Sequence, residues 1–87
     1  MWDWDETKRQ ATFLTRSLDF ALVEDFDLNT AQIDRDDRRD YGEVRLKAIG
    51  MIRGRLFVIV FTPRDTGFRL ISLRKANERE KREWARR

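Results

Sequence analysis

The sequence predicts an α+β domain, in which a mainly antiparallel sheet carries two N-terminal helices and one C-terminal helix in the order β-α-α-β-β-β-β-α. Apolar residues recur at helical spacing near the N-terminus, strand-like runs follow one another in the second half, and a polar segment with a helix-start signal comes last. The 87 residues suit a single domain, 1–87, and any site on a domain of this size is expected to be shallow.

The N-terminal third is expected to combine a short strand with two helices. Residues 2–5 alternate tryptophan and aspartate, which is typical of a short edge strand with both tryptophans on one face. Asp5 suits the N-cap of a helix over 6–16, and Asp19 suits the start of a shorter helix over 20–26. Apolar residues at helical spacing are expected to form the buried stripe of the first helix: Ala11, Phe13, Leu14 and Leu18.

The middle of the chain changes from loop-like to strand-like composition. A brief strand is expected over 29–33, and the run RDDRRDYG at 35–42 is typical of a solvated loop, because six of its residues are charged. From Val44 to Ile49, apolar and polar residues alternate, which predicts a strand with one apolar face and one face that begins cationic. Arg53-Gly54 then predicts a tight hairpin turn.

The last part of the chain is expected to complete the sheet and to end in a helix. The apolar run 56–61 predicts a central strand that is covered on both faces. Residues 63–67 carry turn chemistry and 68–75 form the last strand, so three consecutive antiparallel strands make a meander. Asn77 with Glu80 three residues later forms a capping box for a mostly exposed helix, which Trp84 is expected to anchor.

Composition excludes several classes of site. The chain has no cysteine and no histidine, so disulfides, thiolate zinc sites and histidine bases are excluded, and no metal or other cofactor is expected. The formal net charge is only +3, but bases dominate after Glu43, which makes the second half a candidate phosphate-facing surface. No apolar run is long enough to span a membrane and no secretory signal begins the chain, so a cytoplasmic location is expected.

The stretch ISLRKANEREKREW, residues 71–84, places Arg74 and Lys75 where the last strand meets the final helix. Both cations are candidates for stabilising a phosphate at the rim of the sheet, because guanidinium and ammonium groups match that charge. Solvated charge at a strand end is the alternative. Adjacent side chains of a regular strand point to opposite sides, so at most one of the two is expected to face the site.

Phosphoryl transfer without a metal ion requires a group that takes the proton of the attacking hydroxyl, and histidine is absent from this chain. Tyr41, Glu43 or a lysine with a lowered pKa could take that proton, and Arg64 is a candidate for stabilising the phosphate. Structural roles in the loop and the turn remain open for Tyr41, Glu43 and Arg64. Four cations are candidates for binding a phosphate-bearing polyanion, with ion pairs across the sheet as the alternative for the last two: Lys8, Arg16, Arg45 and Lys47.

Short motifs follow one another in a distinctive order from Trp4 to Trp84. They are Trp4-Asp5-Glu6 with Lys8, Phe20 and Phe26, Asp40-Tyr41-Gly42-Glu43 with Arg45, Ile49-Gly50, Phe61-Thr62 with Arg64, and Ile71-Ser72 with Arg74-Lys75-Ala76. In this order and spacing the motifs resemble the BrnT family, the toxins of a bacterial type II toxin–antitoxin system.

The resemblance implies a RelE-like ribonuclease toxin fold and an RNA substrate, whose cleavage without a metal ion inhibits translation and growth. The polyanion expected at Lys8, Arg16, Arg45 and Lys47 would then be RNA. It also implies a small antitoxin of the ribbon-helix-helix type, which neutralises the toxin in a hetero-oligomer and carries it to operator DNA in an autorepressing complex. Thr15-Arg16-Ser17 stands where family members usually carry Lys-His-Gly. The alternative is therefore a catalytically weakened, toxin-like interaction module that acts by binding its antitoxin.

Overall fold

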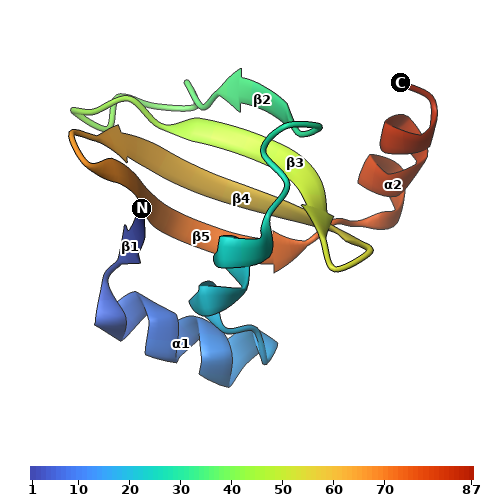
Figure 1. The fold of residues 1–87 in the computed structure, drawn as a ribbon. Coiled ribbons are helices and arrows are strands. Elements are labelled where there is room, and N and C mark those ends of the chain that lie inside the picture. Colours follow the sequence, from blue (N-terminus) through green and yellow to red (C-terminus); the bar gives the residue numbers. More distant parts are fainter.

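The computed structural model describes residues 1–87 and shows an α+β fold built on a five-stranded mixed sheet (Figure 1). Along the chain the elements are β1 (Trp2–Trp4), α1 (Glu6–Arg16), the 3-10 helix η1 (Phe20–Asp25), β2 (Gln32–Arg35), β3 (Leu46–Ile52), β4 (Arg55–Arg64), β5 (Gly67–Lys75) and α2 (Glu78–Ala85). The strands lie in the order β1-β5-β4-β3-β2, with β1 parallel to β5 and the other pairs antiparallel. The α+β prediction is confirmed.

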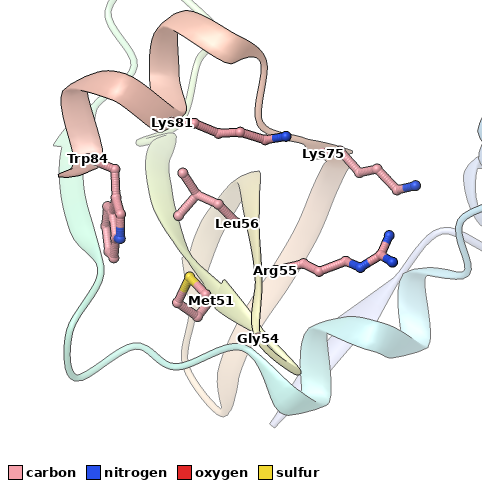
Figure 2. Close-up of a pocket in the computed structure, with 7 residues that line it drawn as sticks. All are labelled: Met51, Gly54, Arg55, Leu56, Lys75, Lys81 and Trp84. Atoms are coloured by element: carbon pink, nitrogen blue, oxygen red, sulfur yellow. The ribbon is translucent and has the colours of Figure 1, made fainter.

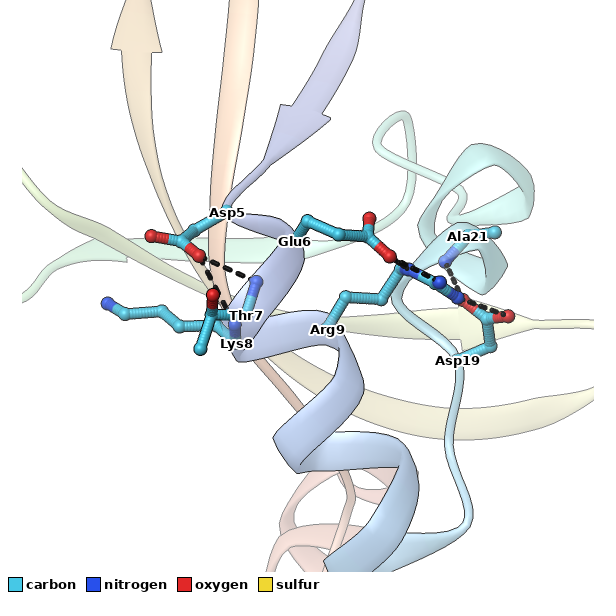
Figure 3. Close-up of polar contacts among 7 residues, drawn as sticks. All are labelled: Asp5, Glu6, Thr7, Lys8, Arg9, Asp19 and Ala21. Carbon is cyan, nitrogen blue, oxygen red and sulfur yellow. Dashed lines mark hydrogen bonds and ion pairs between the residues drawn. The ribbon is translucent and has the colours of Figure 1, made fainter.

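The N-terminal segment of α1 is held by the cap that the sequence predicts. The Asp5 carboxylate accepts hydrogen bonds from the backbone N–H groups of Thr7 at 2.8 Å and Lys8 at 3.3 Å (Figure 3). Arg9 pairs with Glu6 in the first turn and reaches Asp19 at 3.3 Å, at the start of η1. This guanidinium therefore ties the two helices together.

The predicted buried stripe of α1 is wrong. The helix has no buried residue, Leu14 is 83% exposed and Phe13 is 54% exposed, and Ala11 is also exposed. Only Leu18, which follows the helix, is buried. The reason is that η1, and not α1, lies directly on the sheet.

The second helix forms as a 3-10 helix in place of the α-helix expected over 20–26. Its apolar residues Phe20, Val23 and Phe26 are three residues apart, and a 3-10 helix has three residues per turn, so all three point to the sheet and are buried. Phe26 can lie against β3 because Gly50 has no side chain: a Cβ there would be 2.7 Å from the Phe26 ring. The spacing of three residues between these apolar side chains is therefore the feature of the sequence that indicates a 3-10 helix.

The strand expected over 29–33 begins later, at Gln32, and continues to Arg35. The delay comes from a local turn, because the Asp27 carboxylate accepts hydrogen bonds from the Asn29 N–H at 3.0 Å and the Thr30 hydroxyl at 2.8 Å. These side-chain hydrogen bonds hold residues 27–30 in a turn, so that pairing with β3 begins only at Gln32.

The hairpin between β3 and β4 is confirmed at Arg53-Gly54, where both residues have positive φ, 49° and 82°. Positive φ at two central residues matches the twist of the flanking strands. β3 begins at Leu46, later than expected, and β4 extends through Pro63 to Arg64, so the next turn is shorter than the expected 63–67.

β4 is the central strand, and its two faces are covered differently. Phe57, Ile59 and Phe61 point into the main core below η1. On the other face, α2 and its Trp84 cover Leu56 and Val58 at one end only. The register between β4 and β5 shifts by one residue at a bulge, so that Val60 lies opposite Ser72 and Phe61 lies opposite Leu70. Leu70 thereby joins Phe61 in the main core, and Ser72 lies with Val60 on the other face. All six residues from 56 to 61 are buried, so the expected cover on both faces is confirmed, although α2 lies over only one end of the second face.

Helix α2 is attached to the sheet through Glu80 and through the packing of Trp84. The Asn77 side chain caps the helix and the Glu80 carboxylate accepts the Asn77 N–H at 2.8 Å, which confirms the capping box. The same carboxylate binds the Arg74 guanidinium of β5 through two contacts of 2.9 Å. The Arg74 hydrogen bonds lower the pKa of Glu80 to about 2, from an ordinary value of 4.5.

Leu18→Ala is expected to lower the free energy of unfolding by about 2–5 kcal/mol, because it removes a buried side chain and leaves a cavity. The matched change Leu14→Ala, on an 83% exposed residue, is expected to cost no more than about 0.5 kcal/mol. Urea unfolding of both variants measures the difference, and equal losses would contradict the position of α1 described above.

Glu80→Gln is expected to lower the free energy of unfolding by about 1–2 kcal/mol at neutral pH, since glutamine can keep the cap but loses the charge that binds Arg74. The folded pKa is depressed, so this contribution is complete above pH 4.5 and disappears as the pH falls toward 2. Denaturant unfolding at a series of pH values should show the wild type and the variant converging in acid.

Glu83→Gln is the control for this experiment, because Glu83 lies on the same helix and forms an exposed ion pair with Arg79. Its effect is expected to stay below about 0.5 kcal/mol. A Glu80→Gln effect as small as that of the control would show that the Arg74 contact does not hold α2.

Candidate functional site

The face of the sheet opposite η1 is hollowed into a polar cleft of about 650 Å³. Its floor is formed by apolar side chains of the central strands, Val58 and Val60 of β4 and Ile49 of β3. Five cations and four carboxylates surround this floor: Arg16, Arg35, Arg38, Lys47 and Arg74, with Asp34, Asp36, Asp37 and Glu83. The cleft is therefore a strongly charged surface with an apolar base.

Three of the predicted site residues reach this cleft from different elements. Lys47 lies on β3, opposite Val60 of β4, and Arg74 lies on β5, opposite Val58. Arg16 comes from the end of α1 and donates a hydrogen bond of 2.9 Å to the Leu73 carbonyl of β5. The fold thus brings together three cations that are far apart in the sequence.

These cations differ in how far they are already engaged. Arg74 is held by both oxygens of Glu80, and its side chain is 37% exposed. Lys47 forms no ion pair, and its positive charge contributes to the low pKa of Glu80. The hydrogen bond to Glu80 raises the pKa of Arg74, while the charge of Arg38 opposes that rise. The charges of Lys47 and Arg38 therefore act on the ion pair between Arg74 and Glu80.

Asp36 is a part of the cleft that the sequence did not reveal. Its side chain is only 2% exposed and receives two hydrogen bonds from the Arg38 guanidinium, at 2.8 and 2.9 Å. A weaker contact of 3.4 Å comes from the Tyr41 hydroxyl. The Arg38 hydrogen bonds lower the pKa of Asp36 to about 2. The prediction of a solvated loop over 35–42 is wrong at this residue, because a guanidinium two positions away compensates its burial.

A second group of predicted residues lies beside the cleft. The Arg45 guanidinium is 4.0 Å from the centre of the Tyr41 ring, and Glu43 lies 3.3 Å from Arg45 and 3.8 Å from Arg64. These contacts connect the loop before β3 to the end of β4. Arg38 borders both this group and the cleft. Lys47 lies within β3 and points into the cleft. Arg45 precedes the strand and lies over the ring of Tyr41 instead.

Lys75 and Lys8 do not reach the cleft. Lys75 lines a separate pocket (Figure 2), and the register of β5, with Arg74 opposite Val58 and Lys75 opposite Phe57, confirms that the two residues point to different sides. Lys8 is exposed on α1, where its side chain extends away from the Arg9 ion pairs (Figure 3). Any contact of these two lysines with RNA would lie outside the cleft.

The cleft offers phosphate-binding cations and several carboxylates, but no group of three or more side chains arranged to hold a metal ion. Asp34 pairs with Lys47 in the register of β2 and β3, and neither residue forms an ion pair. Asp36, by contrast, is a weak base because its pKa is about 2. Asp34, Asp37, Ser72 and Glu83 were also missed from the sequence, since only the pairing of strands and the docking of α2 bring them here.

No helix of the chain combines the length and apolar character needed to cross a membrane.

A comparison with known families finds a match over most of the chain. The sequence model described as "Ribonuclease toxin, BrnT, of type II toxin-antitoxin system" matches residues 4–80. No curated protein matches the chain. The matched region includes every strand except the start of β1, and it contains Arg16, Lys47 and Arg74. The resemblance found in the sequence motifs is thereby confirmed, and the partner of such a toxin is an antitoxin. This chain belongs to the BrnT family of ribonuclease toxins of type II toxin–antitoxin systems.

Proposed function

We propose that this toxin cleaves RNA in the cleft on the open face of the sheet, without a metal ion, and thereby inhibits translation and growth. The observation that carries the proposal is the convergence of Arg16, Lys47 and Arg74 on one cleft from α1, β3 and β5. A polyanion whose phosphate enters this cleft meets cations from three directions, and such preorganised charges stabilise phosphate better than scattered surface charges do.

The proposed reaction is an attack of the RNA 2′-hydroxyl on the neighbouring phosphorus. A bond forms between the 2′-oxygen and phosphorus, and the bond from phosphorus to the 5′-oxygen breaks. The hydroxyl proton passes to a base, and the leaving oxygen takes up a proton. We assign phosphate stabilisation first to Lys47 and Arg16, because Arg74 is already bound by Glu80 and would share its charge with that carboxylate.

Asp34 is the proposed base. It lies beside Lys47 on the neighbouring strand and forms no ion pair, so its carboxylate is free to accept a proton near the phosphate that Lys47 holds. Tyr41 and Glu43, the candidates from the sequence, are engaged with Asp36, Arg45 and Arg64 at the side of the cleft. We propose that these two residues hold the loop and that Arg45 and Arg64 extend the surface for RNA.

The partner is proposed to be a small ribbon-helix-helix antitoxin that forms a hetero-oligomer with this single-domain, RelE-like toxin in the cytoplasm. The antitoxin would carry the complex to operator DNA and repress its own operon. The support is membership of a type II toxin–antitoxin family, in which a toxin and its antitoxin act together. The toxin itself offers no separate DNA-reading motif.

A catalytically weakened interaction module is the second candidate function. Two observations favour it: Thr15-Arg16-Ser17 stands where relatives usually carry a histidine, and Glu80 already neutralises Arg74 in the cleft. A chain of this kind would bind its antitoxin through the same fold but cleave RNA slowly or not at all.

Lys47→Ala is expected to reduce RNA cleavage by about 100-fold, because it removes a cation that lines the cleft and has no ion-pair partner. Cleavage of total RNA by the purified protein, together with growth after induced expression, measures the effect. Arg79→Ala removes an exposed cation of α2 outside the cleft and should leave both readouts unchanged.

Arg64→Ala locates the site by comparison with Lys47→Ala, because Arg64 lies at the far end of β4 beside Glu43. A larger loss with Arg64→Ala would move the reaction to the Tyr41, Glu43 and Arg45 group. Wild-type expression without growth arrest or RNA breakdown would support the interaction module instead.

Asp34→Asn is expected to lower kcat by about 100-fold and to leave KM nearly unchanged, because a general base acts in the chemical step and an amide keeps the size of the side chain. Steady-state kinetics on a short oligoribonucleotide separate the two constants. Asp37→Asn, a matched change at an exposed acid of the same cleft that pairs with Arg35, is the control. An equal loss in both variants would show only a change in the charge of the cleft.

A further inference from the structure

A second pocket, of about 390 Å³, lies between the β3–β4 hairpin and α2 (Figure 2). It shares no lining residue with the cleft, and Lys75 belongs to it while the adjacent Arg74 belongs to the cleft. Leu56 lies on the same face of β4 as Val58 and Val60 of the cleft, so the pocket is a separate hollow at the hairpin end of that face.

One wall of this pocket is apolar. Leu56 is buried and forms a small core with Val58 and Ala76, against which Met51 and Trp84 pack while remaining partly exposed. The guanidinium of Arg87 lies 3.3 Å from the centre of the Trp84 ring. One face of this ring is therefore covered by Arg87, and the indole contributes an apolar edge to the wall.

The rest of the rim is cationic. Figure 2 shows the amino groups of Lys75 and Lys81 and the guanidinium of Arg55 extending to one side of the pocket, away from Trp84. Lys81 lies 3.1 Å from Glu78, whereas Arg55 and Lys75 form no ion pair. Three elements, β4, β5 and α2, thus place positive charge beside an apolar wall, and most of that charge is not neutralised within the chain.

We propose that this pocket docks an acidic peptide segment of a partner protein, with one large apolar side chain against Met51, Leu56 and Trp84 and with flanking carboxylates at the cationic rim. A pocket of this volume fits one bulky side chain, and the arrangement of charge complements an acidic segment. The identification of that partner as the antitoxin rests on the proposed function. The acidic and apolar character of the segment is inferred from the lining of the pocket alone.

RNA is a poorer match to the same pocket. Base stacking requires an open aromatic face, and one face of Trp84 is occupied by Arg87 while its edge packs against the small core. Phosphate would satisfy the cations, but RNA has no aliphatic side chain to place against Met51 and Leu56. A peptide supplies both the apolar group and the carboxylates.

The test is a selection of a random peptide library, displayed on phage, on the full-length protein, with counter-selection on the double variant Arg55→Glu with Lys81→Glu. Both residues are exposed, and thermal melting checks that the variant is folded. The enriched peptides are expected to combine Asp or Glu with Trp, Phe, Leu or Met, and to bind the double variant at least about tenfold more weakly. In NMR titrations they should shift the indole signal of Trp84.

Arg82→Glu is the matched control, because this exposed cation neighbours Lys81 on α2 but does not line the pocket; it should leave peptide binding unchanged. Enriched peptides without acids, equal binding to the double variant, or displacement of the peptide from Trp84 by hexauridylate would each overturn the proposal. RNA cleavage is measured separately on the same proteins. A wild type that binds the peptide but does not cleave RNA refutes the proposed function and leaves this inference standing.

Discussion

The alternation of side chains along the central strand β4 is the constraint on which the structure depends. Phe57, Ile59 and Phe61 enter the core below η1, and the intervening Val58 and Val60 point to the opposite face. On this second face only α2 lies over the sheet, at one end. Elsewhere polar side chains of β2, β3 and β5 surround Val58 and Val60, which remain buried at the base of the cleft.

The open face becomes a site because charge gathers there and is only partly neutralised. Arg38 and Arg74 are bound by Asp36 and Glu80, and each pair keeps the pKa of its carboxyl near 2. Such pairs build the walls of the cleft and hold α2, so their charges serve mainly structure. Lys47 is left without a counter-ion, and this is what separates a candidate phosphate site from an ordinary network of surface ion pairs.

The junction of β5 and α2 serves two surfaces at once. Because neighbouring residues of a strand point to opposite sides, Arg74 belongs to the cleft and Lys75 to the pocket beside Trp84. The contact between Arg74 and Glu80 holds α2 in the position that shapes both. The cleft proposed for RNA and the pocket proposed for a peptide thus share no lining residue.

The sequence by itself determined the local features: the caps at Asp5 and Asn77, the hairpin at Arg53-Gly54, the α+β class and, through the order of its motifs, the BrnT family. These depend on residues that are close in the chain or on the motif order itself. Only the tertiary structure decided that α1 keeps Leu14 exposed, that Asp36 is buried, and which cations share a cleft. Those outcomes depend on strand register and on contacts between distant residues, such as Arg16 with Leu73, and local composition carries no record of such pairings.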